Sequence, residues 1–444
     1  MKKKKSKMIN IDKFELIIND TNKNKFGEVF TDINLISESL SHLKFNDPKQ
    51  TYYDPTCGHG YFLFFIYDIL MGNGYKYPGY ENVEGLKFII KNETAREKHI
   101  IENMLFGTDI QQESIDVCNK LFKSDKYKTN FICIDFTKYE TNKLFDNIVG
   151  NPPFEDNLND KRKAKNHNLW RPIILKAYKM LADNGIMAFV CPQSWMSWSK
   201  TNADMLGLFN ENAILKLNIN ECRKYFKGVG SSFSYFVLQK TTIKKETEVI
   251  CEYKNINYNS YINFNEKNYF FPLLLTKESM SILNKTVLNK DLEKYPVKFD
   301  SYLHAFTKKD CLQKTKDSTF KYKVWHTPNA ILWANKPHTS QNSWKVFIPT
   351  TTYYESLLCD KCGNTQGMGY IICNDEEDAN NIKNILSLKL YRFIVNITRW
   401  SNWNSPDILK TLPKTEIGDI TDEELYKFFN LTEDEIKFIN EVIK

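Results

Sequence analysis

Apolar runs and amphipathic stretches alternate along the chain from residue 26 to about residue 240. Short apolar runs bounded by Asp or Gly predict buried strands, and stretches with an apolar residue at every third or fourth position predict helices. The pattern predicts strands near 51–54, 103–109, 130–135, 145–150, 185–192 and 233–240, and helices near 60–70, 112–122 and 171–181. This alternation indicates an α/β fold with a mostly parallel sheet and helices on both faces.

The same pattern divides the chain into domains. Residues 1–25 are polar and predict a flexible N-terminal arm. Residues 26–245 form the α/β domain, which an insertion rich in Gly, Tyr, Asn and Lys interrupts at about 71–103. Residues 246–444 predict a second, mixed α/β domain that is irregular and dense in aromatic residues.

The C-terminal tail, residues 415–444, differs from the rest in pattern and charge. Thr421-x-x-Glu424 and Thr432-x-x-Glu435 are capping-box sequences, each of which predicts the start of a short helix. The tail carries nine acidic residues and three lysines, a net charge of −6, whereas the whole chain carries +7. The remainder, at +13, suits a polyanionic partner, although an AT-rich coding sequence would also raise the lysine content.

Several classes of protein do not fit the composition. No apolar run is long enough for a membrane helix, and the lysine-rich start lacks the apolar segment of a secretory signal. Ten scattered cysteines predict reduced thiols and a cytoplasmic protein, with a nuclear one as the alternative in a eukaryotic host. Cys359-Asp-Lys-Cys362 invites a zinc site, but no second pair of ligands accompanies it, so we expect no metal.

Polar residues at the ends of successive predicted strands indicate a ligand site. Gly58 and Gly60, in the loop after Asp54, allow a sharp turn and a close approach of the backbone to a ligand. Asp109 ends the next strand and suits ribose hydroxyls, and Asp135-Phe136 follows the third and suits an adenine ring. Taken singly, each is equally an ordinary turn or a solvated acid, but together they favour a nucleotide-like ligand.

The most informative stretch is the strand 145–150, which runs directly into Asn151-Pro152-Pro153-Phe154. Two prolines fix the backbone and remove two N–H donors, which leaves the Asn151 side-chain oxygen and the Pro152 carbonyl as acceptors. Two acceptors suit a planar amino group that becomes pyramidal, and Phe154 offers an apolar face to a base. The alternative is a rigid turn after a strand.

These residues resemble the motifs of the N6-adenine (amino) DNA methyltransferases in which the cofactor loop precedes the catalytic motif and target recognition comes last. The resemblance implies cofactor-binding residues in the upstream motif, in the glycine loop and at the strand ends, namely Val29, Phe30, Thr31, Asp54, Pro55, Gly58, Gly60, Asp109, Ile110, Asp135, Phe136 and Asn151. It implies catalytic residues at Asn151, Pro152, Pro153, Phe154 and Phe226, the last an aromatic against the flipped base, with Tyr225 as its alternative. The chain departs from the family at Thr31-Asp32, where Thr-Pro is frequent.

The resemblance also implies a Rossmann-like domain, S-adenosylmethionine as cofactor, and double-stranded DNA as substrate, from which an adenine is flipped out. A separate restriction endonuclease is an implied partner if the chain belongs to a restriction-modification pair. RNA adenine or guanine, or a glutamine side chain, could be methylated by the same chemistry, and a non-catalytic DNA-binding protein is a further alternative. Basic residues after the catalytic motif are candidates for DNA phosphate contacts: Lys161, Arg162, Lys163 and Lys165.

Aromatic and basic residues of the second domain are candidates for target recognition. They are Trp325, His326, Trp333, Lys336, Trp344, Lys345, Arg399, Trp400 and Trp403.

Overall fold

The computed structural model describes residues 31–154, 169–226, 232–351, 354–415 and 420–444, which form two compact units. The first unit comprises the described residues of Met1–Gln193, Gly207–Ile250 and Asn263–Lys267, and the second those of Ser194–Leu206, Cys251–Ile262 and Asn268–Lys444. The chain passes between the units at several points, which a single boundary at residue 245 does not describe.

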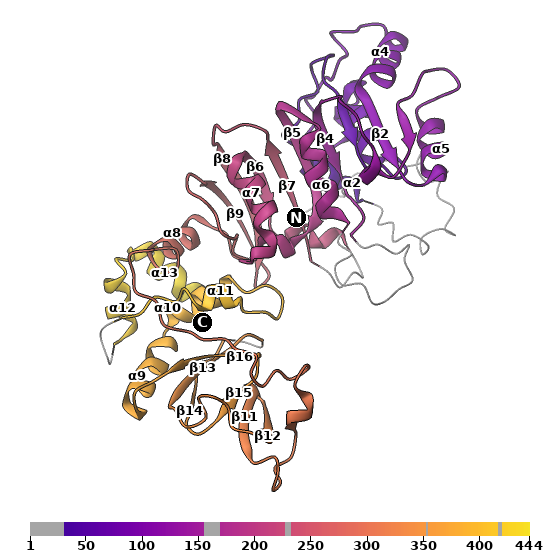
Figure 1. The fold of residues 1–444 in the computed structure, drawn as a ribbon. Coiled ribbons are helices and arrows are strands. Elements are labelled where there is room, and N and C mark those ends of the chain that lie inside the picture. The colour runs from indigo at the N-terminus through magenta and orange to yellow at the C-terminus, as the bar shows by residue number, and fades with distance from the viewer. Residues whose placement is uncertain (1–30, 155–168, 227–231, 352–353, 416–419) are drawn as a thin grey trace, which may run out of the picture. The chain divides into compact units, whose positions relative to one another are not determined.

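A nine-stranded sheet contributes most of its strands to the first unit, and most of these strands are labelled in Figure 1. Its order is β3-β2-β1-β4-β5-β7-β6-β8-β9. The strands are β1 (Tyr52–Asp54), β2 (Leu105–Asp109), β3 (Phe131–Cys133), β4 (Phe145–Gly150), β5 (Leu181–Pro192), β6 (Ala213–Asn218), β7 (Phe233–Gln239), β8 (Glu246–Tyr253) and β9 (Ile256–Asn263). Strands β1 to β5 pair in parallel, and β7 runs antiparallel to β5 and β6. The expected mostly parallel sheet is therefore confirmed.

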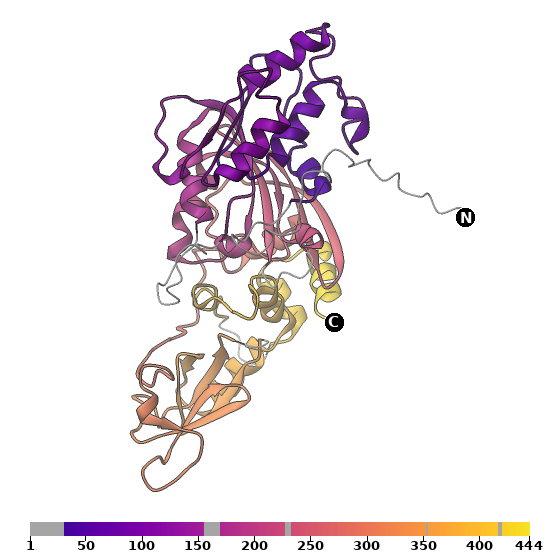
Figure 2. The ribbon, with the colours of Figure 1, turned by 90° about the vertical axis from the view of Figure 1, so that its right-hand side faces the viewer.

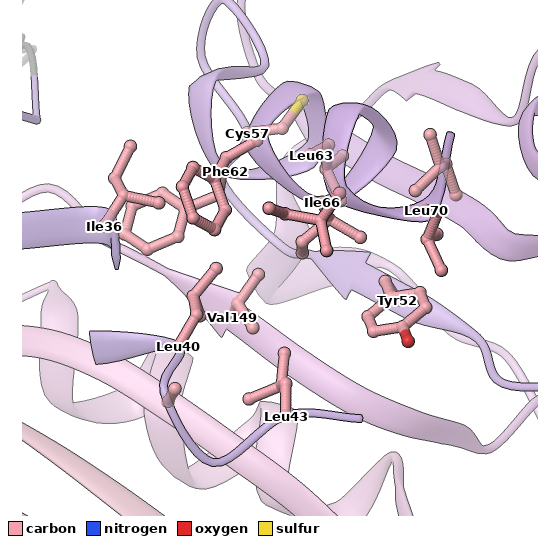
Figure 3. Packing of buried hydrophobic residues seen from close by; sticks show 14 of the residues in the cluster. Ile36, Leu40, Leu43, Tyr52, Cys57, Phe62, Leu63, Ile66, Leu70 and Val149 are labelled. Carbon is pink, nitrogen blue, oxygen red and sulfur yellow. The ribbon is translucent and has the colours of Figure 1, made fainter. Parts of the chain in front are cut away.

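Helices cover both faces of this sheet. On one face lie α2 (Ile33–Ser39), α3 (Tyr61–Leu70) and α5 (Gln112–Leu121), whose apolar side chains share one core with Tyr52 and Val149 of the sheet. Figure 3 shows Phe62, Leu63 and Ile66 of α3 with Ile36 of α2 near the ring of Phe62, and Leu40, which follows α2, near Val149.

The neighbouring residues along each strand point to the other face. There α6 (Trp170–Lys179) packs on β5, and Phe209 of α7 (Ala203–Glu211) meets the ring of Phe236 at 4.9 Å between centroids. Alternation along the strands thus places one core on each side of the sheet.

The insertion at about 71–103 holds one α-helix, α4 (Glu93–His99). The buried carboxylate of Glu97 accepts hydrogen bonds from the hydroxyls of Tyr67 (2.7 Å) and Tyr127 (2.8 Å) and from Lys123. Burial alone would raise the pKa of Glu97, but these donors lower it to about 2. The insertion is therefore fastened to α3 and to the segment after α5.

The second unit contains two small sheets, drawn in orange in Figure 2. One has the order β10-β12-β11-β15 and the other β14-β13-β16. Their strands are β10 (Leu312–Gln313), β11 (Tyr322–Thr327), β12 (Ala330–Ala334), β13 (Lys345–Pro349), β14 (Leu357–Cys359), β15 (Gly363–Asn364) and β16 (Met368–Ile372).

The helices of the second unit are α8 (Lys277–Lys285), α9 (Glu376–Leu386), α10 (Lys389–Ile397), α11 (Pro406–Leu409), α12 (Asp422–Phe428) and α13 (Glu433–Val442). Both predicted capping boxes form, at the starts of α12 and α13. In the part of the chain that the structure describes, no helix has the length and apolar character needed to cross a membrane.

Candidate active site

The loop between β1 and α3 has the backbone that its glycines predict. Gly58 and Gly60 adopt φ values of +50° and +83°, a left-handed conformation that side chains disfavour, and Gly60 is the N-cap of α3. A Cβ at Gly60 would lie 3.1 Å from the Cys118 sulfur, whereas a Cβ at Gly58 would meet no described atom within 4 Å. The backbone at Gly58 therefore borders open space.

Two buried cysteines, Cys57 of the loop and Cys118 of α5, help to hold this loop in place. Cys57 and Cys118 are 5% and 0% exposed, and their sulfur atoms lie 4.0 Å apart. The Cys118 thiol donates to the Gly58 carbonyl at 3.3 Å, and the backbone N–H of Cys57 donates to the Thr108 carbonyl at 2.9 Å. The loop is thus bonded both to α5 and to β2.

Asp109, at the end of β2, fastens the same loop. Its carboxylate accepts one hydrogen bond from the backbone N–H of Gly58 and another from that of Gln111, each at 2.9 Å. Ile110, the next residue, leaves 53% of its surface exposed. The expected ribose acid therefore adjoins the glycine loop, with an exposed apolar side chain beside it.

Asp54 ends β1 and is almost fully buried. Burial and the nearby charge of Asp109 raise its pKa to about 8, against the lowering effect of a hydrogen bond from the Thr56 N–H. The end of β4 lies against this carboxylate, because a Cβ on Gly150 would be 2.8 Å from Asp54 Oδ1. Pro55, the next loop residue, is buried, and its carbonyl accepts from the Thr108 hydroxyl at 2.9 Å. This packing brings the residue before Asn151 directly onto the cofactor loop.

Asp135 and Phe136 follow β3. The Asp135 carboxylate accepts from the backbone N–H of Thr137 (3.0 Å) and from its hydroxyl (2.6 Å), and these bonds lower its pKa. The Phe136 ring is 4% exposed and lies 6.1 Å from the ring of Tyr53. In this structure Phe136 is part of the core, and Asp135 caps the short 3-10 turn after it.

The tetrapeptide Asn151–Phe154 begins where β4 ends. Pro152 is buried, Pro153 is exposed, and Phe154 is half-buried. The Asn151 amide donates from Nδ2 to the Thr31 hydroxyl oxygen at 3.1 Å. Its Oδ1 is shielded from solvent, and no described residue donates a hydrogen bond to it. A buried acceptor without a donor is costly in a folded protein and often marks a functional site.

Three aromatic rings form one stack beside the tetrapeptide. The Phe233 ring lies 4.9 Å from that of Phe154 and 4.0 Å from that of Phe226. Phe226 is 5% exposed, so its outer face is largely covered in this structure. Sequence reasoning missed Phe233, which had no signal beyond being the first apolar residue of a strand.

Tyr225, the expected alternative to Phe226, is held by α2. Its hydroxyl donates to Glu38 Oε1 at 2.5 Å, and the Lys224 ammonium lies 4.7 Å from its ring centroid. Burial and Glu38 raise the pKa of Tyr225. Among the other predicted residues, Val29, Phe30, Lys161, Arg162, Lys163 and Lys165 lie outside the described residues.

The residues expected to recognise the target differ in how far their side chains are buried. Lys345, Arg399 and Trp400 are buried, Trp403 is exposed, and the remainder, Trp325, His326, Trp333, Lys336 and Trp344, are intermediate. The Lys345 ammonium donates to the carbonyls of Ser340 and Cys362, which is a structural role.

Cys359 and Cys362 lie close together at the turn between β14 and β15, with their Cα atoms 6.4 Å apart. In the ranges that the structure covers, no three His, Cys, Asp or Glu side chains gather as a metal site requires.

The parallel sheet, the glycine loop and the acids at its strand ends define the fold of the S-adenosylmethionine-dependent methyltransferases. The family model of the Eco57I restriction-modification methylases matches residues 3–226, which is half of the chain. The chain belongs to this family. A comparison with curated proteins finds no match.

Two of the matching solved structures align with almost the whole chain at low sequence identity. A nuclease-deletion mutant of the Type ISP restriction-modification enzyme LlaGI, in complex with a DNA substrate mimic, is 12% identical with a TM-score of 0.58, over 98% of this chain and 56% of that one. The Type IIL enzyme MmeI in complex with DNA is 13% identical with a TM-score of 0.52, over 97% of this chain and 77% of that one. A type I methyltransferase subunit from Streptococcus thermophilus is 17% identical with a TM-score of 0.35, over 52% of this chain and half of that subunit's length.

Proposed function

We propose that this protein transfers the methyl group of S-adenosylmethionine to the N6 atom of an adenine flipped out of duplex DNA. The observation that carries the proposal is the buried Oδ1 of Asn151, which no described residue satisfies, at a strand end that packs on the cofactor loop. An amino group that donates to this oxygen would supply the missing hydrogen bond.

The loop residues fit the cofactor. Gly58 borders open space, so that a ligand can approach its backbone, and Asp109 lies beside it to accept from ribose hydroxyls. When bound, S-adenosylmethionine supplies a methyl group activated by a sulfonium. Thr31, Asp54 and Ile110 are the further residues that we assign to its binding.

The chain's own residues position the base and stabilise its amino group. Asn151 Oδ1 and the Pro152 carbonyl accept the two N–H bonds of the adenine amino group, which turns its lone pair toward the methyl donor. Phe154 stacks on the base, which offsets part of the cost of flipping at about 1–3 kcal/mol. Phe233 supports the Phe154 ring from behind.

Duplex DNA is the proposed partner because one face of the β10–β12–β11 sheet is basic and aromatic. Leu332 and Ala334 point to the other face, into a core with Val324. The opposite face carries Lys323 and Trp333, which are cross-strand neighbours. We call these two residues, with Ile331, the Trp333 face.

Charge favours a polyanion at the Trp333 face. Lys316 is exposed, and its ammonium lies 5.2 Å from the Trp333 ring centroid. Residues 308–336 contain seven lysines and two aspartates, a net charge of +5. Lysines attract phosphates and the tryptophan offers a stacking surface, as in nucleic-acid-binding proteins. The DNA complexes of MmeI and LlaGI support the same partner.

Sequencing of modified bases in DNA from cells that express the chain tests the proposal. We expect N6-methyladenine at one recurrent sequence. The Asn151→Ala variant should lose the mark, because removal of one transition-state hydrogen bond typically costs about 10²- to 10³-fold in rate. The exposed Asn103→Ala serves as the matched control and should keep it.

Purified protein with labelled cofactor separates the alternatives. Duplex DNA, RNA and peptide pools are offered in parallel, and label should enter the DNA. Label that enters only RNA or only peptide would contradict the proposal, as would a mark that survives Asn151→Ala.

A further inference from the structure

We infer that Thr31 is a positioning residue that fixes the orientation of the Asn151 side-chain amide, so that its oxygen and not its NH2 group faces the substrate. The inference rests on the proposed function and adds to it a task for Thr31 beyond contact with the cofactor.

The two ends of the Asn151 amide have different surroundings. Nδ2 donates to Thr31 Oγ1 at 3.1 Å, across 120 positions of sequence. Oδ1 is shielded from solvent, and no described residue donates to it. The hydroxyl of Thr31 therefore holds the donor end and leaves the acceptor end for a ligand.

A flipped amide would reverse this arrangement. Oδ1 would then turn to the Thr31 hydroxyl, which can also donate, and the NH2 group would take the position that no described residue satisfies, with its N–H donors toward the substrate. Facing an adenine amino group, these donors would repel it. The side-chain orientation thus decides whether Asn151 can accept a hydrogen bond from the substrate.

Helix α2 holds Thr31 in place. Asp32, the next residue, is the N-cap of α2, and its side chain accepts from the backbone N–H of Asn34 at 2.8 Å. Leu35 and Ile36 of the first turn are fully buried in the core of the first unit. The aspartate that stands where the family often has proline thus begins the helix that anchors Thr31.

A hydroxyl has one proton and two lone pairs. Once Thr31 donates that proton to an anionic group of a bound ligand, it can only accept from Asn151. Ligand binding at Thr31 would then lock the amide in the orientation that methyl transfer requires.

Two variants separate positioning from packing. Thr31→Val keeps the shape and removes the hydroxyl, and Thr31→Ser keeps the hydroxyl. Thr129→Val is the matched control, because it removes another threonine–asparagine bond of the first unit, that from Thr129 to Asn119 at 2.6 Å.

Rates are measured at saturating S-adenosylmethionine, which compensates for any loss of cofactor affinity. We expect kcat of Thr31→Val to fall roughly tenfold or more. Thr31→Ser should recover most of the rate that Thr31→Val loses, because it keeps the hydroxyl that accepts from Asn151, and Thr129→Val should stay within about threefold of the wild type.

A measurement of duplex binding gives a second test, whose result would not change if Thr31 had only a structural role. With S-adenosylhomocysteine bound, the affinity for a duplex with adenine at the target position is compared with that for a duplex with purine there, which lacks the amino group. The wild type should prefer adenine, and Thr31→Val should lose the preference.

Equal loss of affinity for both duplexes would overturn the inference. So would an unchanged kcat with only a raised dissociation constant for the cofactor, because Thr31 would then serve the cofactor alone. Failure of the proposed function is distinguishable, since it would appear in the wild type as an absence of adenine methylation.

Discussion

The backbone N–H of Gly58 donates a hydrogen bond to Asp109 Oδ2 at 2.9 Å, although 51 positions separate the two residues. This bond fixes the glycine loop on the end of β2. The same carboxylate also accepts from Gln111, so that both of its oxygens are used to hold backbone at this strand end.

Replacement of Asp109 should therefore weaken cofactor binding in two ways. Asp109→Ala removes the expected acceptor for ribose and releases the Gly58 backbone. Hydrogen bonds to charged groups contribute about 1.5–3 kcal/mol each, so we expect a loss of affinity of at least about tenfold. Calorimetric titration with S-adenosylmethionine measures it, and the exposed Asp125→Ala is the control. Unchanged affinity in Asp109→Ala would exclude Asp109 from the cofactor site.

Asp54 should make the stability of the free protein depend on pH. Its pKa is raised from 3.8 to about 8, so the folded state binds a proton more tightly than the unfolded chain does. The stabilisation from this group is complete below pH 4 and is lost as the pH rises toward 8. Asp54→Asn removes the titration.

The melting temperature of Asp54→Asn minus that of the wild type should accordingly increase between about pH 4 and pH 8 and level off above it. Thermal unfolding without cofactor at a series of pH values checks this. A difference that stays constant across the window would show that Asp54 is ionised in the folded protein at neutral pH.

The Phe154–Phe233–Phe226 stack should contribute to stability mainly through Phe233 and to substrate binding mainly through Phe154. Phe233→Ala removes the middle ring from a buried position, which typically costs about 3–5 kcal/mol of stability. Phe154→Ala, at a half-buried ring, should cost less stability than Phe233→Ala and weaken binding of the target duplex by about 1–3 kcal/mol through lost stacking.

Denaturant unfolding and duplex titration separate these two effects. The exposed Phe88→Ala should change neither quantity, because 68% of its surface is in solvent. If Phe154→Ala binds the target duplex as the wild type does, Phe154 has no part in holding the base.

Lysines of the second unit should fall into two classes. Exposed Lys316 and half-buried Lys323 lie on or over the Trp333 face, so Lys316→Ala and Lys323→Ala should lower DNA affinity and reduce its dependence on salt by about one counterion each. Lys345→Met should lower stability instead, because the Lys345 ammonium binds carbonyls inside the second unit. Titrations at several salt concentrations, together with melting temperatures, distinguish the classes. A salt slope that only Lys345→Met changes would contradict this assignment.

The local sequence was sufficient to predict an element where strong start or stop signals bound it. The strand 145–150 and the pair of helices in the tail appear at their expected positions, because Asn-Pro-Pro ends the former and capping boxes begin the latter.

Strand β6 was missed because its apolar run contains Lys216, a residue that argues against burial. Lys216 is nevertheless 7% exposed, and its ammonium pairs with Glu248 of the adjacent strand β8 at 3.3 Å. A charge that is neutralised by a partner 32 positions away cannot be read from a local window. Lys345 was expected among the residues for target recognition, but its ammonium donates to the carbonyls of Ser340 and Cys362, and the second of these partners, 17 positions away, also lies beyond a local window.

The candidate site shows the same limit. Strand ends identified Asp54, Asp109 and Asn151, because parallel strands carry their ligands at one edge. The hydrogen bond between Thr31 and Asn151 and the ring of Phe233 behind Phe154 depend on tertiary packing, and no spacing rule predicts them.

The buried thiol of Cys57 in the glycine loop offers a way to measure how often this loop opens. Cys57 is shielded in the closed loop, and its pKa is raised by its bond to Cys118 and by burial, whereas Cys133 is exposed to reagents. Alkylation of Cys57 can then proceed only as fast as the loop opens. The exposed Cys133 in the same sample reports the intrinsic reactivity of the reagent. A ligand seated against Gly58 would slow the first reaction and leave the second unchanged, so the rate of covalent labelling would measure how tightly the loop is held.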